Sequence, residues 1–170
     1  MKALVEDLLL LARLDETRPV QRASVDLAVL AADVCSDAIA ADPSRRVVLD
    51  APVPVLVSGD TDHLRQAIAN LVSNAVRHTP AGTLIEVAAH TADGHAVVVV
   101  RDHGNGLADD ALAHAFDRFW QADHARTGAG AGLGLSIVAA IVHEHSGRVS
   151  AANAADGGAV FTIELPLDAA

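Results

Sequence analysis

The sequence predicts a two-layer α/β sandwich, in which a mixed β-sheet is covered by helices on one face. Its 170 residues are enough to bury the core of one ordinary domain. Hydrophobic residues make up 51% of the chain but aromatic residues only 2%, so the core must consist of Val, Leu, Ile and Ala. Stretches with helical periodicity are interspersed with short apolar runs rich in β-branched residues, an order that favours a sheet covered by helices.

The first half of the chain contains three stretches whose apolar residues recur at steps of three and four, the spacing of an amphipathic helix. The second of these begins at a predicted cap and ends before Pro43. Two short apolar runs around a turn with proline predict strands. The expected elements are helices at 1–16, from the cap at 24–26 to 41, and at 61–79, and strands at 46–49 and 53–57.

The second half predicts two hairpins and two helices. Thr91-Ala-Asp-Gly94 is a turn sequence between two apolar runs, and Asp156-Gly-Gly158 lies between two others. Gly147 is expected to be the C′ residue that ends the last helix. The expected elements are strands at 84–90, 96–102, 148–153 and 159–165, and helices at 109–115 and 132–145.

The charge balance and the cysteine count restrict the partners and the compartment. The formal net charge is −10, from 12 Lys and Arg against 22 Asp and Glu, which argues against a nucleic-acid partner. Cys35 is the only cysteine, so no disulfide framework can form and a cytoplasmic location is expected. The apolar run at 8–12 is too short to cross a bilayer, and no signal peptide is predicted.

Two amides and two basic side chains lie close together on the helix predicted at 61–79. Asn70 and Asn74 are four residues apart and therefore share a face, and Arg77 and His78 follow one turn further. Amide oxygens are ligands that divalent cations accept in proteins, and the basic side chains suit an anion. Taken alone, Asn74 would more often be an ordinary polar residue on a helix surface.

Asp102 is expected at the end of the strand at 96–102, directly before a loop that contains Gly104 and Gly106. Glycines at such a place allow another group to approach the backbone closely. Taken alone, this motif is also compatible with a simple Asp-Gly turn.

Three glycines precede the last predicted helix. Gly130, Gly132 and Gly134 alternate with other small or apolar residues, among them Leu133, before the apolar run that begins at Leu135. Free N–H groups at a helix N-terminus form an anion site. The stretch is not a P-loop, because no Gly-Lys-Ser/Thr follows, and not a dinucleotide fingerprint, because it follows a long loop rather than a strand. A flexible linker remains the alternative.

The segment at 107–130 has no regular pattern except one short helix. A loop of this length in a compact domain is usually functional or disordered. Phe116, Phe119 and Trp120 flank Arg118, and bulky apolar residues in a loose segment suggest docking onto the domain or a partner. We expect the segment to be a mobile lid.

Together, these motifs resemble the nucleotide-binding boxes of sensor histidine kinases. Asn70-Leu-x-x-Asn-Ala-x-x-His78 resembles the N box, and Asp102-His-Gly-Asn-Gly106 resembles the G1 box. Phe116-Asp-Arg-Phe-Trp120 resembles the F box, and Gly130-Ala-Gly-Leu-Gly-Leu135 resembles the G2 box. Each box alone is weak, but four in this order make a specific match over roughly residues 24–166.

The resemblance implies the fold and the domain organisation of the gyrase, Hsp90, histidine kinase and MutL ATPase superfamily. Residues 1–18 would be the end of the second dimerisation helix and a linker, and residues 19–170 would be the ATP-binding catalytic domain. A helix that simply packs on the domain is the alternative for the first stretch.

The resemblance also implies ATP and Mg²⁺ as the bound species. Asp102 would accept a hydrogen bond from the adenine amine, with the base against Gly104 and Gly106. Asn74 would be the Mg²⁺ ligand, with Asn70 near the phosphates. Catalysis is expected of Asn70, Asn74, Arg77 and Arg118. The other residues implied in phosphate binding are His78, Gly130, Gly132, Leu133, Gly134 and Leu135.

The implied reaction transfers the γ-phosphoryl group of MgATP to a histidine on a dimerisation domain, and from there to an aspartate of a response regulator. An acceptor histidine would lie in a His-Glu-x-x-(Thr/Ser/Asn)-Pro box. The only His-Glu pair, His143-Glu144, continues differently, so the acceptor is expected outside this chain. The full-length protein is expected to be a membrane-bound homodimer, and this chain alone a monomer.

Three other functions remain open. Hydrolytic ATPases of the superfamily have a water-activating glutamate where Asn70 stands, and an amide cannot accept the proton. An anti-sigma-factor serine kinase shares the fold but not the N-terminal helix. A nucleotide-binding regulatory module without catalysis is the third alternative.

Overall fold

The computed structural model describes residues 9, 11–12, 22–120 and 132–168 of the chain. A five-stranded sheet has the strand order β2-β4-β5-β7-β6, and β1 and β3 form a separate two-stranded sheet. The helices and strands are, in chain order, β1 (Ala23–Asp26), α2 (Leu27–Ala41), β2 (Arg46–Asp50), β3 (Leu56–Gly59), α3 (Thr61–His78), β4 (Leu84–Ala92), β5 (His95–Asp102), α4 (Asp109–His114), α5 (Gly134–Glu144), β6 (Arg148–Asn153) and β7 (Ala159–Pro166).

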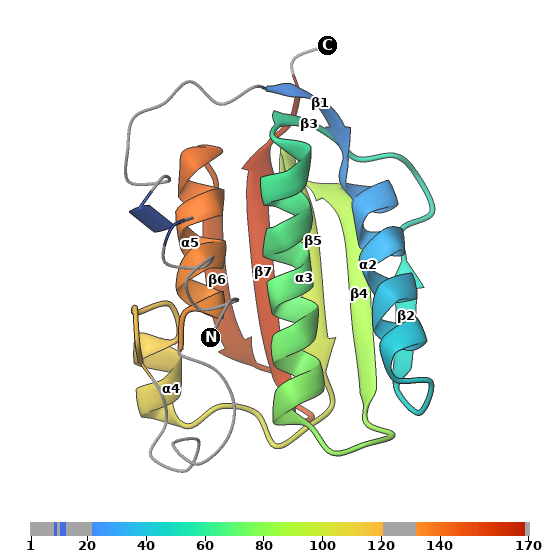
Figure 1. The fold of residues 1–170 in the computed structure, drawn as a ribbon, viewed down its shortest axis with the longest axis vertical. Helices are drawn as coiled ribbons and strands as arrows, with labels where there is room; N and C mark the ends of the chain where they lie inside the picture. The colour runs from blue at the N-terminus through green and yellow to red at the C-terminus, as the bar shows by residue number, and fades with distance from the viewer. Residues whose placement is uncertain (1–8, 10, 13–21, 121–131, 169–170) are drawn as a thin grey trace.

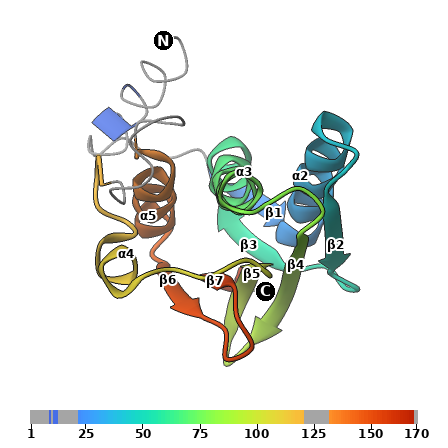
Figure 2. The same ribbon diagram turned by 90° about the horizontal axis from the view of Figure 1, so that it is seen from below.

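Helices α2, α3 and α5 lie side by side over one face of the five-stranded sheet (Figure 1). Figure 2 shows the sheet and these helices as two layers, with α4 at one side near α5 and β6. Within the described ranges, the opposite face of the sheet carries no helix. The predicted two-layer α/β sandwich is therefore confirmed.

The core fills the space between the helices and the sheet. Successive strand residues point to opposite faces, so Val98 and Val100 of β5 point the same way as Phe161 and Ile163 of β7, and all four are almost fully buried. Leu71 of α3 is completely buried in the same cluster. This packing fixes α3 against β5, the two elements that carry the first two predicted motifs.

Strand pairing places the end of β5 in the interior of the sheet. β5 is antiparallel to β4 on one side and to β7 on the other, while β2 joins β4 in parallel. Asp102, the last residue of β5, lies opposite Ile85. β5 and α3 both end at the lower edge of Figure 1, so Asp102 and the last turn of α3 lie at the same end of the molecule.

The N-terminal part differs from the prediction in its strand pairing. Residues 24–26 are not only a cap, because they form most of β1, which pairs antiparallel with β3. Asp26 also caps α2, since its Oδ1 accepts hydrogen bonds from the N–H groups of Ala28 at 3.0 Å and Val55 at 2.9 Å. The strand predicted at 46–49 is β2. The one predicted at 53–57 shares only its last two residues with β3, and the two strands belong to different sheets.

The end of α5 corrects another expectation. Ser146, with φ 57°, is the left-handed C′ residue, and its N–H donates to the carbonyl of His143 at 2.9 Å. Gly147 follows as C″ and donates to the carbonyl of Val142 at 2.9 Å, which completes a Schellman motif. Gly147 is nevertheless required, because a Cβ atom there would overlap the carbonyl oxygen of Glu164.

Two predicted features fall largely outside the described residues. These are the helix at 1–16, of which residues 9, 11 and 12 are described as helical, and the second half of the proposed lid, at 121–131. Leu11 is 3% exposed and belongs to the core. None of the helices among the described residues is long and apolar enough to cross a membrane.

Candidate functional site

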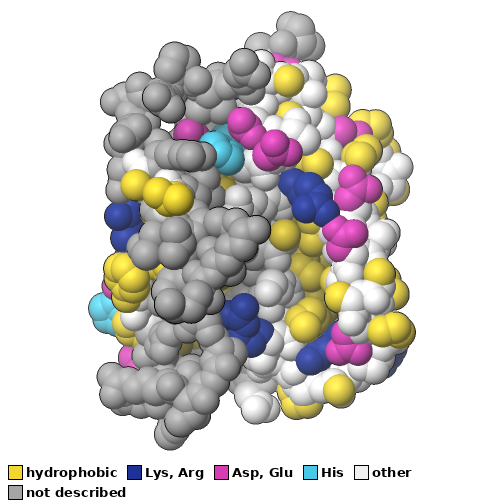
Figure 3. Space-filling view, in the orientation of Figure 1, with side chains coloured by type: hydrophobic (Ala, Val, Ile, Leu, Met, Phe, Trp, Pro, Cys, Tyr) yellow, Lys and Arg dark blue, Asp and Glu magenta, His cyan; other side chains and the backbone are white. Residues whose placement is uncertain are grey.

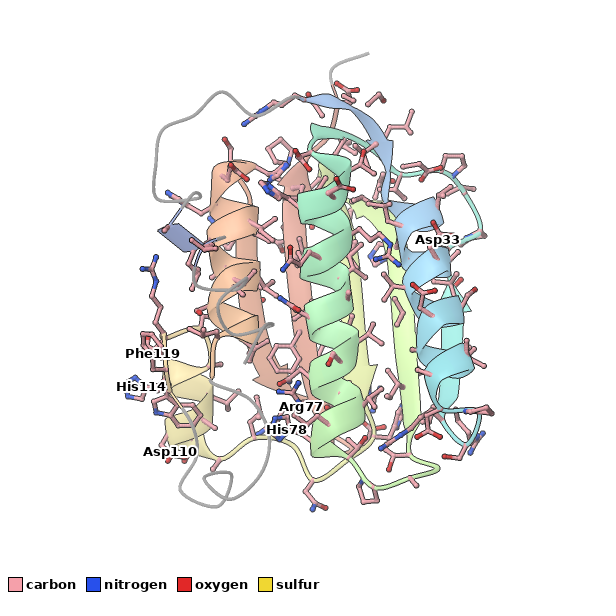
Figure 4. The ribbon with its side chains drawn as sticks, viewed as in Figure 1. Asp33, Arg77, His78, Asp110, His114 and Phe119 are labelled. Carbon is pink, nitrogen blue, oxygen red and sulfur yellow. The ribbon has the colours of Figure 1, made fainter. Side chains whose placement is uncertain are left out.

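Helix α3 carries the first group of predicted site residues. Asp60 caps its start, since the carboxylate accepts a hydrogen bond at 3.0 Å from the N–H three residues further on. Burial of the apolar side of α3 leaves Asn70 and Asn74 half-buried, and Arg77 and His78 exposed in the last turn. Figure 4 shows the two basic residues at the foot of α3, where cations also interact favourably with the helix dipole.

Asn70 connects α3 to the start of α5. Its Nδ2 donates a hydrogen bond to the carbonyl of Gly134 at 3.2 Å. The first predicted motif is thereby joined to the last one across 64 residues of sequence. The amide oxygen of Asn70 is not used in this bond, so it stays able to accept from another donor or bind a cation.

Asp102 is a buried carboxylate at the end of a central strand, with 6% of its surface exposed. Two backbone N–H groups donate to its Oδ1, that of Gly104 at 2.8 Å and that of Ala159 at 3.3 Å. Both hydrogen bonds that the described residues make to this side chain end on the same oxygen. The carboxylate is therefore held in one orientation by main-chain groups, and Oδ2 is the oxygen available to a ligand.

Gly104 is tightly enclosed by its own fold. A Cβ atom there would lie 2.9 Å from Asp102 Oδ1 and 2.9 Å from Cγ2 of the buried Thr79, the residue that follows α3. Arg45 holds this residue in turn, donating to the carbonyls of Thr79 at 3.0 Å and Pro80 at 2.9 Å. Arg45 was not among the residues predicted from the sequence, because nothing in the local pattern shows that it reaches the end of α3.

Gly106 and Gly158 complete the surroundings of the loop. Gly106 has φ 75°, and a Cβ atom there would lie 2.7 Å from Oδ1 of Asn153. Gly158 has φ 86°, and a Cβ atom there would overlap the carbonyl oxygen of Asp102. Sequence reasoning assigned Gly158 only to a hairpin turn. Its contact with Asp102 was missed, although the Gly-Gly pair indicated an unusual backbone.

The charges at the end of α3 reach Asp102. Partial burial of the ring lowers the pKa of His78, the guanidinium of Arg77 lowers it further, and the carboxylate of Asp102 acts in the opposite direction. Arginine side chains are visible near the foot of α3 in Figure 3. The helix end and the strand end thus form one electrostatic environment.

The start of α5 has the expected open helix terminus. Leu133 is the N-cap residue, 1% exposed, and no side chain caps the helix. Gly132 has φ 69° and is therefore left-handed, whereas a Cβ atom on Gly134 would meet nothing within 4 Å. Leu135 packs against the core. Gly130 lies outside the described residues.

Arg118 lies in the turns that follow α4. Its neighbour Phe119 is 61% exposed, and Figure 4 places Phe119 beside α4, well apart from Arg77 and His78 at the foot of α3. The N–H of Phe119 donates to the carbonyl of Gly132 at 3.2 Å, so the segment before residue 120 meets the start of the α5 region. The described geometry therefore leaves the role expected for Arg118 as a prediction.

Neither the cavity formed by the described residues nor a metal cluster among them adds a candidate at this end of the molecule. A cavity of about 370 Å³ lies at the opposite end, lined by residues that include Arg22, Ser58 and His145. Its lining shares no residue with the predicted motifs. Within the described part of the chain, no group of three His, Cys, Asp or Glu residues could hold a metal ion, which does not bear on a site based on an amide oxygen.

Comparison with known proteins agrees with this geometry. The sequence profile of the family described as "Histidine kinase-, DNA gyrase B-, and HSP90-like ATPase" matches residues 59–169. The probable sensor histidine kinase TcrY of Mycobacterium tuberculosis is 42% identical over 97% of this chain and 35% of its own length. The histidine-protein kinase BaeS of Escherichia coli is 36% identical over 97% of this chain and 36% of its own length. The chain thus spans about a third of these relatives.

Solved structures give the same result for the fold. Full-length ShkA in complex with AMPPNP superposes with a TM-score of 0.84 and 32% identity, covering 99% of this chain and 36% of that one. The mycobacterial sensor histidine kinase MprB superposes with a TM-score of 0.77 and 26% identity, covering 88% of this chain and 99% of that one. The chain belongs to the histidine kinase-, DNA gyrase B- and HSP90-like ATPase family, and within it to the ATP-binding catalytic domains of sensor histidine kinases.

Proposed function

We propose that this chain binds MgATP between α3, the loop after β5 and the start of α5, and presents its γ-phosphoryl group to a histidine on a dimerisation domain. The orientation of Asp102 is the observation that carries the proposal. A buried carboxylate held through Oδ1 by two backbone N–H groups offers Oδ2 to a donor such as the exocyclic amine of adenine. A hydrogen bond to a charged group contributes about 1.5–3 kcal/mol.

The base lies against Gly104 and Gly106 in this proposal. At both glycines, other protein atoms occupy the place where a Cβ would project. In this proposal the ligand therefore contacts only their backbone atoms. A flat backbone surface beside a buried acceptor suits a planar ring with one amine. The similar ShkA was solved in complex with AMPPNP, which supports an adenine nucleotide as the ligand.

The phosphates extend from Asp102 toward the N-terminus of α5. Phosphoryl transfer requires positioning and charge neutralisation, because the transition state spreads negative charge over the oxygens. Arg77 and His78 at the end of α3 supply donors from one side, and the backbone of residues 132–135 supplies N–H groups from the other, with Gly130 and Arg118 as further candidates. The hydrogen bond from Asn70 to Gly134 holds the two sides together.

Asn74 is the residue we propose as the protein ligand of Mg²⁺. Its side chain is half-buried on the same face as Asn70, and an amide oxygen is a hard ligand that Mg²⁺ accepts together with phosphate and water oxygens. The ion would neutralise part of the phosphate charge. Asn70 and Asn74 are both amides, neither of which can take a proton from water, so the site favours transfer to an acceptor over hydrolysis.

The whole protein would extend beyond this chain. We propose that residues 1–18 end a dimerisation helix and that residues 19–170 form the catalytic domain of a homodimeric membrane sensor. The phosphorylated histidine would then donate to a response-regulator aspartate. Two observations support this arrangement. The relatives are about three times as long as this chain, and its sequence contains no acceptor box.

Phosphorylation in trans tests the proposal. The chain alone, mixed with labelled MgATP, should bind the nucleotide without becoming labelled. Adding a separate dimerisation domain with its acceptor histidine, taken from one of the related kinases, should give slow formation of acid-labile phosphate on that domain only, since the proximity of a tethered acceptor is missing. Brisk ATP hydrolysis without any acceptor, or acid-labile phosphate on this chain alone, would show that the reaction class is wrong.

A further inference from the structure

The turn between β6 and β7 holds the loop that follows β5. The carboxylate of Asp156 pairs with Arg101 at 2.6 Å, which is also the main reason that the pKa of Asp156 is lowered. Gly158 packs on the main chain of Asp102, and the N–H of Ala159 donates to its carboxylate. The hairpin thus contacts the strand end that carries the proposed adenine acceptor, although 55 residues separate Arg101 from Asp156.

Asn153, the last residue of β6, makes the most specific contact of this hairpin. Its Oδ1 accepts a hydrogen bond from the N–H of Leu107 at 2.8 Å, and its Nδ2 donates to the carbonyl of the same residue at 2.8 Å. One planar side-chain amide therefore satisfies both polar groups of one residue, as a neighbouring strand would. The pairing also fixes which amide atom is oxygen, because only this orientation gives both bonds.

Gly106 allows this close approach. It has φ 75°, and a Cβ atom there would lie 2.7 Å from Oδ1 of Asn153, too close for any ordinary contact. The Asn153 amide therefore determines the height and orientation of the loop at Gly106 and Leu107. Asp102 and Gly104 at the start of the same loop are held by other contacts. Asn153 fixes the other end of the loop, where Leu107 also packs against the core.

We propose that Asn153 is a positioning residue of the nucleotide site, which holds Gly106 and Leu107 so that their backbone forms one wall of the adenine pocket. This inference rests on the proposed function, because the wall matters only if a base lies against it. Asn153 touches no reacting atom, and it acts through the loop. Its loss lets the wall shift away from the base, and the affinity for MgATP then falls while the rest of the fold is retained.

Three substitutions of Asn153 test this role by changing its two hydrogen bonds with Leu107 in different ways. Asn153→Ala removes both hydrogen bonds. Asn153→Asp keeps the acceptor for the Leu107 N–H but turns a carboxylate oxygen toward the Leu107 carbonyl, where two acceptors repel each other. Asn153→Gln keeps both groups on a chain that is one methylene longer and places them incorrectly. The matched control is Ser150→Ala, an exposed position on the same strand outside this contact.

The affinity for MgATP, measured by calorimetry near neutral pH, should fall about tenfold in Asn153→Ala and at least as much in Asn153→Asp, in line with the loss of two modest hydrogen bonds. Ser150→Ala should bind as the native chain does. Native affinity in folded Asn153→Ala overturns the proposal. If the native chain itself fails to bind MgATP, the proposed function fails instead, and the two failures are therefore distinguishable.

The pH dependence of Asn153→Asp excludes a purely structural role. A protonated carboxyl can donate to the Leu107 carbonyl, as the native amide does. Lowering the pH from about 7 to about 4, near the ordinary pKa of an aspartate, should therefore recover part of the affinity of Asn153→Asp relative to the native chain. Asn153→Ala has no group that could recover the bond and should show no such gain. An identical pH profile for the two variants contradicts the proposal.

A measurement without nucleotide gives a second test. Hydrogen exchange at the Leu107 amide should accelerate in Asn153→Ala, because its acceptor is gone, whereas amides within β5 should keep their protection. If exchange accelerates throughout β5, the side chain supports the sheet as a whole and the positioning role is wrong. Unchanged exchange at Leu107 would overturn it as well.

Discussion

Gly158 packs so closely against Asp102 that a Cβ atom at position 158 would overlap the carbonyl oxygen of that residue. The two residues are 56 positions apart in the sequence. The N–H of the next residue, Ala159, donates a hydrogen bond to the Asp102 carboxylate. The hairpin turn after β6 therefore supports both the main chain and the side chain of the proposed adenine acceptor. Any side chain at position 158 must push the two apart.

Gly158→Ala should destabilise the fold and weaken nucleotide binding together. The left-handed backbone costs an alanine about 1–2 kcal/mol, and the overlap with Asp102 adds at least about as much again. Gly82→Ala is the matched control, because Gly82 has φ 80° but open space around its Cβ position. Urea unfolding and ATP titration should show a larger loss for Gly158→Ala. Equal losses of stability in the two variants would mean that the overlap is relieved at no cost.

Asp102 should select adenine over guanine. Guanine presents a carbonyl where adenine presents an amine, and a carboxylate repels a carbonyl. Asp102→Asn should weaken ATP binding about ten- to a hundredfold, because the charged acceptor is lost, and should narrow the preference for ATP over GTP. Competition titrations with both nucleotides measure this. Equal affinity of the native chain for ATP and GTP would contradict the assignment.

The pKa of His78 should lie below its ordinary value and should respond in opposite directions to its two charged neighbours. Arg77→Gln should raise the pKa, since the guanidinium lowers it, and Asp102→Asn should lower it further. Titration of the ring by NMR checks both shifts. A shift of the same sign in both variants would show that the helix end and the strand end do not face each other as described.

The lowered pKa of His78 also makes the stability of the fold depend on pH. The unfolded chain takes up the proton at a higher pH than the folded one does, so the contribution of His78 to stability decreases as the pH falls through the interval between the two pKa values. The decrease in the free energy of unfolding over that interval should be smaller in His78→Gln. The opposite sign would mean that the folded protein stabilises the charged imidazole.

Asn74→Ala should remove the dependence of nucleotide affinity on Mg²⁺ while the fold is retained. The variant loses the one protein oxygen that we assign to the ion, so ATP should bind equally with magnesium and with a chelator. Ser73→Ala, an exposed neighbour on α3, is the control. An undiminished Mg²⁺ effect in Asn74→Ala would place the ligand on another residue.

The sequence by itself determined most of the elements and their layering, but not β1 or the bounds of β3. Helical spacing predicted α2 and α3, β-branched runs predicted β4, β5 and β7, and turn residues predicted both hairpins. These signals are local, because amphipathic periodicity shows directly which side of an element will be buried. The resemblance of the four boxes then indicated the family, and the comparisons with known proteins confirmed it.

The tertiary structure alone decided which residues hold the site together. The bond from Asn70 to Gly134, the clamp of Asn153 on Leu107 and the overlap that forces glycine at position 158 each join residues more than 40 positions apart. The pairing of β1 with β3 is of the same kind, and the sequence analysis missed it. No local pattern encodes such contacts, because they depend on the packing of the whole sheet and helix layer rather than on the periodicity of any one element.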